Sequence, residues 1–389
     1  MKIILTIPFV FLSFISFSQK TIGNFFYAKT KDSLPFLKYS LGEDRLGSAK
    51  MTFLDSEVIL KVVDSFKTDY KVQLSQLHSA WIDKKNVLKI PFENLKENLT
   101  DSWKVFGDSL FDYVTIQLPN KVPYKSMMEI DPSRIVIDIF GAVNNTNWIT
   151  QLSTVKEIKN AWCEQPEDDV MRVFIELKHP QFWGYKIYYD TLNKLTVRVR
   201  RQLKMLSLKN LTIAIDAGHG GENIGASGTR SDILEKDYTL LIAKEVKKDL
   251  LLAKAKVVMT REKDTSLSMY QRITYLELQN PNLLVSIHLN SSDVDTVKGV
   301  STYYRYIGFR PLSQSILKSI LAPGSGLREY ANVGNFNFAL SGPTDYPNCL
   351  VEVAFLSNTE DEKKILNPKF RQMIAKRIVA GIQDFLKNL

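Results

Sequence analysis

Cysteine is scarce in this sequence. The 389 residues contain 2 cysteines, Cys163 and Cys349, which lie far apart in the chain and form no CxxC pair. A disulfide framework and a cysteine-based metal site are therefore both excluded. We expect two buried free thiols in different domains, and a long-range disulfide is the alternative.

Long apolar runs are also missing, except at the N-terminus. Residues 1–18 contain one cation, Lys2, then an apolar run to about Phe17, with small residues at Ser16 and Ser18. This arrangement is typical of a secretory signal peptide, and the run is short for a membrane span, which needs about 20 apolar residues. We therefore expect a secreted, periplasmic or cell-wall-associated protein with no membrane span in the mature chain. A buried N-terminal strand or an uncleaved anchor is the alternative.

Charge of one sign is not concentrated in any part of the chain. The formal net charge is +9 and the pI is about 9.2. The excess is spread over both halves, which argues against nucleic-acid binding. A mild positive field suits an acidic polymer such as a bacterial cell wall, or a membrane surface. The length predicts two or three domains at about 150 residues each.

The first half of the chain is rich in short strands. Residues 20–100 alternate short apolar runs with polar turns, which is typical of a small β-barrel-like domain. Residues 103–202 continue this pattern as a second β domain. In it Leu195, Val197 and Val199 alternate with polar residues, so these three side chains should face a core.

The rhythm changes after residue 208. Continuous apolar strands alternate with amphipathic helices, which predicts an α/β domain over 208–389 with a mostly parallel sheet flanked by helices. The predicted strands cover 211–215, 256–260, 283–287 and 350–355, and the predicted helices cover 235–253, 268–279 and about 370–386.

Histidine is scarce too, and two of the 4 histidines occupy informative positions. His219 and His288 each follow the carboxyl end of a predicted strand, where α/β sheets place their sites. Glu235 opens the first long helix. Two histidines and one carboxylate are a common catalytic zinc set, although either histidine alone is more often structural. For His78 and His179, in the β-rich half, we expect an ordinary surface or half-buried position.

A further carboxylate interrupts an apolar strand. Glu352 lies within Cys349-Leu350-Val351-Glu352-Val353-Ala354-Phe355. Burial of an unpaired carboxylate is costly, and a cation or a reacting water beside it would supply a reason. The alternative is a glutamate on the solvent face of an edge strand.

Five short motifs together resemble the zinc-dependent N-acetylmuramoyl-L-alanine amidases. The motifs are IDAGHGG (215–221), LEKD (234–237), MTR (259–261), SIHLN (286–290) and VEVAFLSN (351–358). They occur in the family's order and at about its spacing over residues 208–389.

The resemblance implies a role for each matching residue. His219, Glu235 and His288 would bind Zn²⁺, and Glu352 would act as the catalytic base and then the acid. The implied reaction is hydrolysis of the amide bond between N-acetylmuramic acid and L-alanine of peptidoglycan, in cell-wall remodelling and daughter-cell separation.

Other polar residues near the motifs have less certain roles. Asp216 and Asn290 could orient the histidine rings, and a purely structural turn role is equally consistent with their positions. Arg261 and Arg272 could pair with acidic groups of the domain or with carboxylates of the peptide stem. No substrate-binding residue is assigned.

Weaker resemblances concern the β-rich half. Residues 103–202 resemble the AMIN domain, a β-sandwich found ahead of peptidoglycan amidases, and residues 20–100 are distantly similar to bacterial barrels of the Src-homology-three type. We expect Trp103, Trp148 and Trp183 to fill the β-domain core rather than to stack on sugars, and the same for Trp162. The implied partners are peptidoglycan and an activator or cell-division protein, with no nucleic acid.

Two other functions stay open at this point. The chain could be an inactive amidase-like protein that binds the wall, or a zinc carboxypeptidase that acts on the stem peptide. Some similar amidases carry a long helical insertion that blocks the active site. The segment between His288 and Glu352 already has to supply a strand near 299–306 and a helix near 311–321, so we expect no blocking helix.

Overall fold

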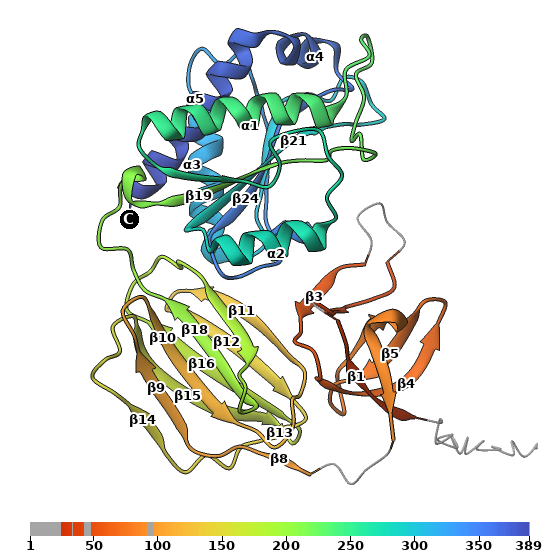
Figure 1. The fold of residues 1–389 in the computed structure, drawn as a ribbon, viewed down its shortest axis with the longest axis vertical. Helices are drawn as coiled ribbons and strands as arrows, with labels where there is room; N and C mark the ends of the chain where they lie inside the picture. The colour runs from red at the N-terminus through yellow and green to blue at the C-terminus, as the bar shows by residue number, and fades with distance from the viewer. Residues whose placement is uncertain (1–24, 33, 43–47, 92–95, 389) are drawn as a thin grey trace, which may run out of the picture.

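The structure, a computed structural model, describes residues 25–32, 34–42, 48–91 and 96–388. The predicted signal peptide at 1–18 lies outside the described residues. Two β-rich regions lie side by side, and a C-terminal α/β region lies against both of them (Figure 1). Among the helices of these described ranges, none is long and apolar enough to cross a membrane.

The first β region is one antiparallel sheet. Its strand order is β3-β2-β6-β5-β4-β1-β7. The strands are β1 (Phe26–Thr30), β2 (Phe36–Lys38), β3 (Lys50–Phe53), β4 (Ile59–Phe66), β5 (Asp69–Gln73), β6 (Ser79–Asp83) and β7 (Val87–Ile90). Alternate residues such as Leu60 and Val62 are buried on one face, as the period of two requires. Closure of this sheet into a barrel stays a prediction.

The middle β region contains two sheets packed face to face. One has the order β14-β9-β10-β18-β17 and the other β11-β12-β16-β15, with a short β13-β8 pair beside them. The strands are β8 (Asn98–Leu99), β9 (Trp103–Gly107), β10 (Phe111–Gln117), β11 (Tyr124–Ile130), β12 (Ser133–Phe140), β13 (Ala142–Val143), β14 (Ile149–Gln151), β15 (Ile158–Glu167), β16 (Val170–Leu177), β17 (Tyr185–Tyr189) and β18 (Lys194–Arg200). Leu195, Val197 and Val199 are buried in the core, as predicted.

The tryptophans of this region do not all behave as expected. Trp103 is buried in the β core, as expected. Trp183 is buried in the core of the α/β region, with its ring centroid 5.9 Å from that of Phe385, and Trp148 is 69% exposed, so the predicted place of these two in the β-domain core is wrong. Trp148 immediately precedes the short edge strand β14, whose residues lie at the surface. Trp162 is half-buried and stacks on Phe174 with ring centroids 5.0 Å apart.

The α/β region is built on a six-stranded sheet in the order β20-β19-β21-β24-β22-β23. Its strands are β19 (Thr212–Ala217), β20 (Lys256–Met259), β21 (Leu283–Asn290), β22 (Val300–Tyr303), β23 (Glu329–Val333) and β24 (Asn348–Phe355). Its helices are α1 (Glu235–Leu252), α2 (Met269–Gln279), α3 (Arg310–Ile320), α4 (Thr359–Leu366) and α5 (Pro368–Lys387). Side chains of α1, α3 and α5 share one core with the sheet, and α2 packs on the opposite face (Figure 1).

The sheet is mixed: four of its five strand pairs are parallel and one is antiparallel. The pairs of β19 with β20, β19 with β21, β21 with β24 and β22 with β23 are parallel, but β22 runs antiparallel to β24. The reason is the short connection 291–299, which reverses the chain after β21. A parallel return would need a crossover of a dozen or more residues.

Two elements of this region escaped the sequence-based prediction. β23 is a largely polar strand at the sheet edge, and α4 is a short, charged helix. Neither carries a long enough apolar pattern to be recognised. Cys163 and Cys349 are both free thiols, as expected, but Cys163 is half-buried whereas Cys349 is buried.

Candidate metal centre

The first site residue lies in a tight turn after β19. His219 has a φ of 61°, in the left-handed region, and is flanked by glycines. Gly218 is required by close packing: a Cβ at this position would lie 2.4 Å from Cε1 of His288. The absence of a side chain at Gly218 therefore lets the two histidines approach each other. Their ring centroids lie 4.9 Å apart.

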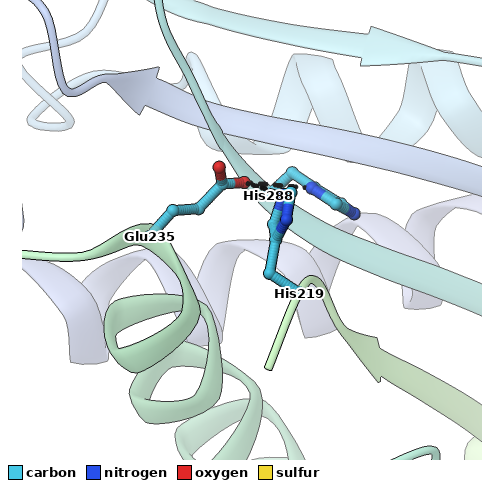
Figure 2. A group of neighbouring side chains, drawn as sticks. All are labelled: His219, Glu235 and His288. Carbon is cyan, nitrogen blue, oxygen red and sulfur yellow. Dashed lines mark hydrogen bonds and ion pairs between the residues drawn. The ribbon is translucent and has the colours of Figure 1, made fainter. Parts of the chain in front are cut away.

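Three side chains from three elements converge on one point (Figure 2). His219 follows β19, Glu235 is the first residue of α1, and His288 is near the end of β21. Oε1 of Glu235 lies 3.0 Å from Nε2 of His219 and 3.0 Å from Nδ1 of His288. The possible ligand atoms of the three residues all lie within 4.8 Å of one another. The structure thus brings together the three residues that the sequence singled out.

The carboxylate at the centre is held from behind by backbone amides. The N–H of Leu289 donates to Oε1 of Glu235 at 2.9 Å, and the N–H of Ala226 donates to Oε2 at 2.8 Å. Glu235 and His288 are buried, and His219 is half-buried. The carboxylate therefore has a fixed orientation toward both imidazoles, with its charge placed at the N-terminus of α1.

Burial and hydrogen bonding act in opposite directions on these groups. Burial alone would raise the pKa of Glu235, but the hydrogen bonds from His219 and His288 outweigh it and hold that pKa well below its usual range. Burial lowers the pKa of His219, yet its hydrogen bond to Glu235 leaves the net shift upward. The carboxylate is therefore ionised at neutral pH, which is the state that a cation needs.

Glu352 lies on β24 directly beside the cluster. It is the register partner of His288 on β21 and of Ser301 on β22. Register partners on adjacent strands lie about 4.8 Å apart and project to the same face. Burial, with a smaller contribution from the charge of Glu352, raises the pKa of the nearby Tyr303. Glu352 thus occupies a central strand next to the candidate metal centre, not the solvent face of an edge strand.

Asp216 is the centre of a buried ionic network beneath the site. Its Oδ1 accepts from Arg272 Nη1 at 2.5 Å and from Thr260 at 2.6 Å, and its Oδ2 accepts from Ser286 at 2.6 Å. Arg272 in turn donates to the backbone carbonyl of His219 at 2.5 Å. The hydrogen bonds of Asp216 therefore support the turn that carries His219 rather than an imidazole ring.

The other polar residues near the motifs have structural contacts. Arg261 donates to the carbonyls of Ala217 and Gly218 at 2.9 and 2.8 Å, so it holds the first turn. Asn290 accepts from the N–H of Ser291 at 2.8 Å and interacts with Tyr303. Arg272 thus pairs with an acidic group of the domain, Asp216, whereas Arg261 binds backbone carbonyls, and the contacts of Asn290 are those of a turn residue.

Two contacts of the site escaped the sequence reasoning. Oδ1 of Asn223 lies 2.8 Å from Nδ1 of His219, which leaves Nε2 of that ring facing Glu235. The ring of Phe338 packs edge-on against His288, with centroids 5.2 Å apart. An asparagine four residues after His219 was the only available signal for the first contact. No sequence pattern indicated the second.

The remaining histidines have carboxylate partners of their own. Nε2 of His78 lies 2.8 Å from Oε1 of Glu167, and Nδ1 of His179 lies 2.7 Å from Oε2 of Glu157. Each is a single His–Glu pair, and no third His, Cys or carboxylate is grouped with either in the described residues.

Comparison with known proteins identifies two parts of the chain. Residues 213–384 match the family described as N-acetylmuramoyl-L-alanine amidase, and residues 101–199 match the AMIN domain. A probable cell wall amidase, LytH of Staphylococcus epidermidis, is 33% identical over 203 residues, which are 50% of this chain and 65% of that protein.

Solved structures of similar proteins cover the α/β region. The catalytic domain of CwlV, an amidase from Bacillus (Paenibacillus) polymyxa, is 34% identical, with 45% of this chain and 98% of that chain covered and a TM-score of 0.43. An amidase from Clostridium difficile is 32% identical, with 45% and 96% covered and a TM-score of 0.43. The two family matches, to residues 213–384 and 101–199, agree with the two resemblances that the sequence indicated.

Proposed function

We propose that this chain, which carries an N-acetylmuramoyl-L-alanine amidase domain at residues 213–384 and an AMIN domain at 101–199, hydrolyses the amide bond between N-acetylmuramic acid and L-alanine in peptidoglycan. The single observation that carries the proposal is the convergence of His219, Glu235 and His288 beside Glu352. Both an electrophilic centre and a proton carrier are then available at one edge of the sheet.

The donor set of the cluster fits zinc. Two imidazole nitrogens and one ionised carboxylate oxygen form a three-ligand set of the kind found in catalytic zinc sites, with one position left for water or substrate. Nε2 of His219 and Nδ1 of His288 both face Glu235, so no ring has to turn to offer a nitrogen. His219, Glu235 and His288 would hold the ion.

Glu352 is suited to move the proton. When bound, Zn²⁺ supplies a Lewis acid that polarises a carbonyl oxygen and lowers the pKa of water. Glu352 accepts the proton of the attacking water as the C–O bond to the lactyl carbonyl carbon forms. It then donates that proton to the L-alanine nitrogen as the C–N bond breaks. One carboxylate therefore serves as base and then acid.

The proposed activity implies a cellular location and partners for the protein. The substrate would place the protein outside the cytoplasm, in the periplasm or at the cell wall, where cell-wall remodelling and daughter-cell separation occur. An activator or cell-division protein remains a proposed partner. The division into 20–100, 103–202 and 208–389, with a signal peptide at 1–18, likewise remains a proposal.

The test is digestion of purified sacculi by residues 19–389, with products identified by mass. We expect intact stem peptides with a free L-alanine amino terminus, loss of their release with a chelator, and recovery with Zn²⁺. Release of terminal D-alanine instead would identify a carboxypeptidase. Binding of sacculi without release, in a zinc-loaded chain, would mean either a missing activator or a wall-binding role, and absence of release with an activator supplied would overturn the proposal.

A further inference from the structure

The segment 334–346 connects the metal centre to the β regions. Phe338 packs against His288 with the ring planes at 74°, and Phe336 stacks on Phe338 with centroids 5.6 Å apart and planes at 19°. Phe336 also contacts Tyr303 at 4.3 Å. Phe336 and Phe338 are half-buried and Tyr303 is buried, and their rings form a wall that begins at His288.

Asn337, between the two phenylalanines, is bound by the first β region. The N–H of Lys50 donates to Oδ1 of Asn337 at 3.0 Å, and Nδ2 of Asn337 donates to the carbonyl of Ser48 at 3.0 Å. Both ends of the side-chain amide are therefore used by the backbone next to and at the start of β3. The partners lie almost 300 positions earlier in the chain, so no local turn accounts for the contact.

Further contacts fix β3 on the α/β region. Arg305 donates to the carbonyls of Lys50 and Met51. Phe53 packs against the apolar cluster that contains Leu340 and Tyr346, together with Leu34. These contacts combine apolar burial with polar bonds, as in a built interface rather than a flexible tether.

The middle β region holds the other end of the same segment. The N–H of Tyr185 donates to the carbonyl of Thr344 at 2.8 Å, and the hydroxyl of Thr344 donates to the carbonyl of Tyr185 at 2.6 Å. Arg198 pairs with Asp345 at 3.4 Å. The two β regions also share one continuous apolar core, to which Phe309 of the α/β region belongs.

We propose that the first β region is a positioning part of the catalytic site. Through Asn337 it holds Phe338 against His288, and so it fixes both a proposed zinc ligand and the adjacent wall. Asn337 is a positioning residue, because it acts through its neighbours. The catalytic consequence rests on the proposed amidase function, whereas the docking of β3 on Asn337 does not.

The test compares two asparagines in the full chain. Asn337→Ala removes both bonds to the first β region, and Asn337→Asp keeps the acceptor for the Lys50 N–H. The control is Asn332→Ala, because Asn332 donates to Thr302 and Ser313, each at 2.8 Å and both within the α/β region. Hydrogen exchange followed by mass spectrometry is measured at β3 and at 336–341, together with kcat and KM on sacculus fragments and zinc content per chain.

For Asn337→Ala we expect faster exchange at Lys50 and at 336–341, and a fall in kcat of roughly tenfold to a hundredfold, since small misplacements at a reacting centre have effects of that size. Zinc content should be unchanged and KM should change less than kcat. Asn337→Asp should recover part of the loss, and Asn332→Ala should resemble the wild type in both measurements.

A remote variant tests the same link. Arg305→Ala loosens β3 without touching Asn337, so it should also speed exchange at 336–341, and the double variant with Asn337→Ala should lose less than the product of the single losses. Unchanged exchange in Asn337→Ala, or equal effects of Asn332→Ala, would overturn the proposal. A wild-type chain that releases no stem peptide would bear on the amidase function alone, because the exchange measurements would still decide whether β3 holds Asn337.

Discussion

The β regions and the α/β region each contain two histidines, and all four contact a glutamate. In the β regions each histidine has its own partner, as in His78 with Glu167 and His179 with Glu157. These two imidazoles are about 40% exposed, at 38% and 44%. In the α/β region His219 and His288 share a single buried oxygen of Glu235. A His–Glu contact alone therefore does not distinguish the candidate metal centre. What distinguishes it is one carboxylate oxygen shared by two histidines.

Topology explains the difference. The parallel strands β19 and β21 end at the same edge of their sheet, and α1 begins there, so side chains from distant positions meet at one point. The antiparallel strands of the β regions point in alternating directions, and their histidines lie on loops or strand ends that do not meet. A metal ion needs several donors around one position, and within the described residues the only such group lies in the first arrangement.

The largest effect is expected at Glu352. Glu352→Gln should lower kcat by about 10²–10⁴-fold, because a positioned proton carrier contributes a factor of this size. Zinc content should stay at the wild-type level, since the three proposed ligands are intact. Stem-peptide release and metal analysis on the same sample check both statements, and near wild-type turnover would remove Glu352 from the mechanism.

Disruption of the buried ionic network around Asp216 should cause a large loss of stability. Asp216→Ala leaves Arg272, 1% exposed, without its charge partner, and we expect a loss of about 3–5 kcal/mol in the free energy of unfolding. Denaturant unfolding measures it. The double variant Asp216→Ala with Arg272→Met should recover much of this loss, because an apolar pair replaces a buried ion pair. No recovery would mean that Asp216 acts in some other way.

The carboxylate of Asp216 should also make the stability of the protein depend on pH. Burial would raise the pKa of Asp216, but the Arg272 charge, with His288 and two hydroxyl donors, holds it below its ordinary value. A pKa depressed by folding contributes stability that is fully present above the unfolded value of about 3.9 and is lost as the pH falls through the folded value. Unfolding measured from pH 6 down to acid should therefore show a larger loss of stability below pH 4 in the wild type than in Asp216→Ala, which keeps only the part that comes from other carboxylates such as Glu235.

A smaller effect, on zinc affinity, is expected at Asn223, whose contact with His219 the sequence did not predict. Asn223→Ala frees Nδ1 of His219, and we expect a loss of about 10–100-fold in zinc affinity, as is common when the partner of a metal-binding histidine is removed. Asn290→Ala is the matched control, since Asn290 contacts Ser291 and Tyr303 and not a histidine. A competition assay with a zinc chelator ranks the two variants. A larger effect of Asn290→Ala would favour the role that the motif position suggested.

The smallest effect is expected in the β regions. Glu167→Gln replaces the partner of His78, and we expect at most about 1 kcal/mol of lost stability, because this pair is partly exposed to solvent. Zinc affinity should be unchanged. A loss of zinc in this variant would contradict the conclusion that zinc binds at the shared carboxylate of Glu235 and not at a single His–Glu pair.

The sequence was sufficient for the elements that depend on local pattern. Strand alternation predicted the burial of Val197 and Val199, and the apolar spacing predicted α1, α2 and α5 nearly to their ends. The motifs predicted His219, Glu235, His288 and Glu352, because strand ends and a helix start are readable in the chain. Local pattern failed for α4 and β23, which have too little apolar periodicity, and for Trp148, whose exposure depends on its place at a sheet edge.

Only the tertiary structure decided the contacts between distant parts of the chain. The direction of β22, the support of His219 by Arg272 and Asn223, and the hold of β3 on Asn337 all depend on which surfaces meet after folding. Residue type and periodicity report how each segment buries its own apolar face. They do not report which polar groups then lie opposite one another, because that is set by packing across the whole molecule.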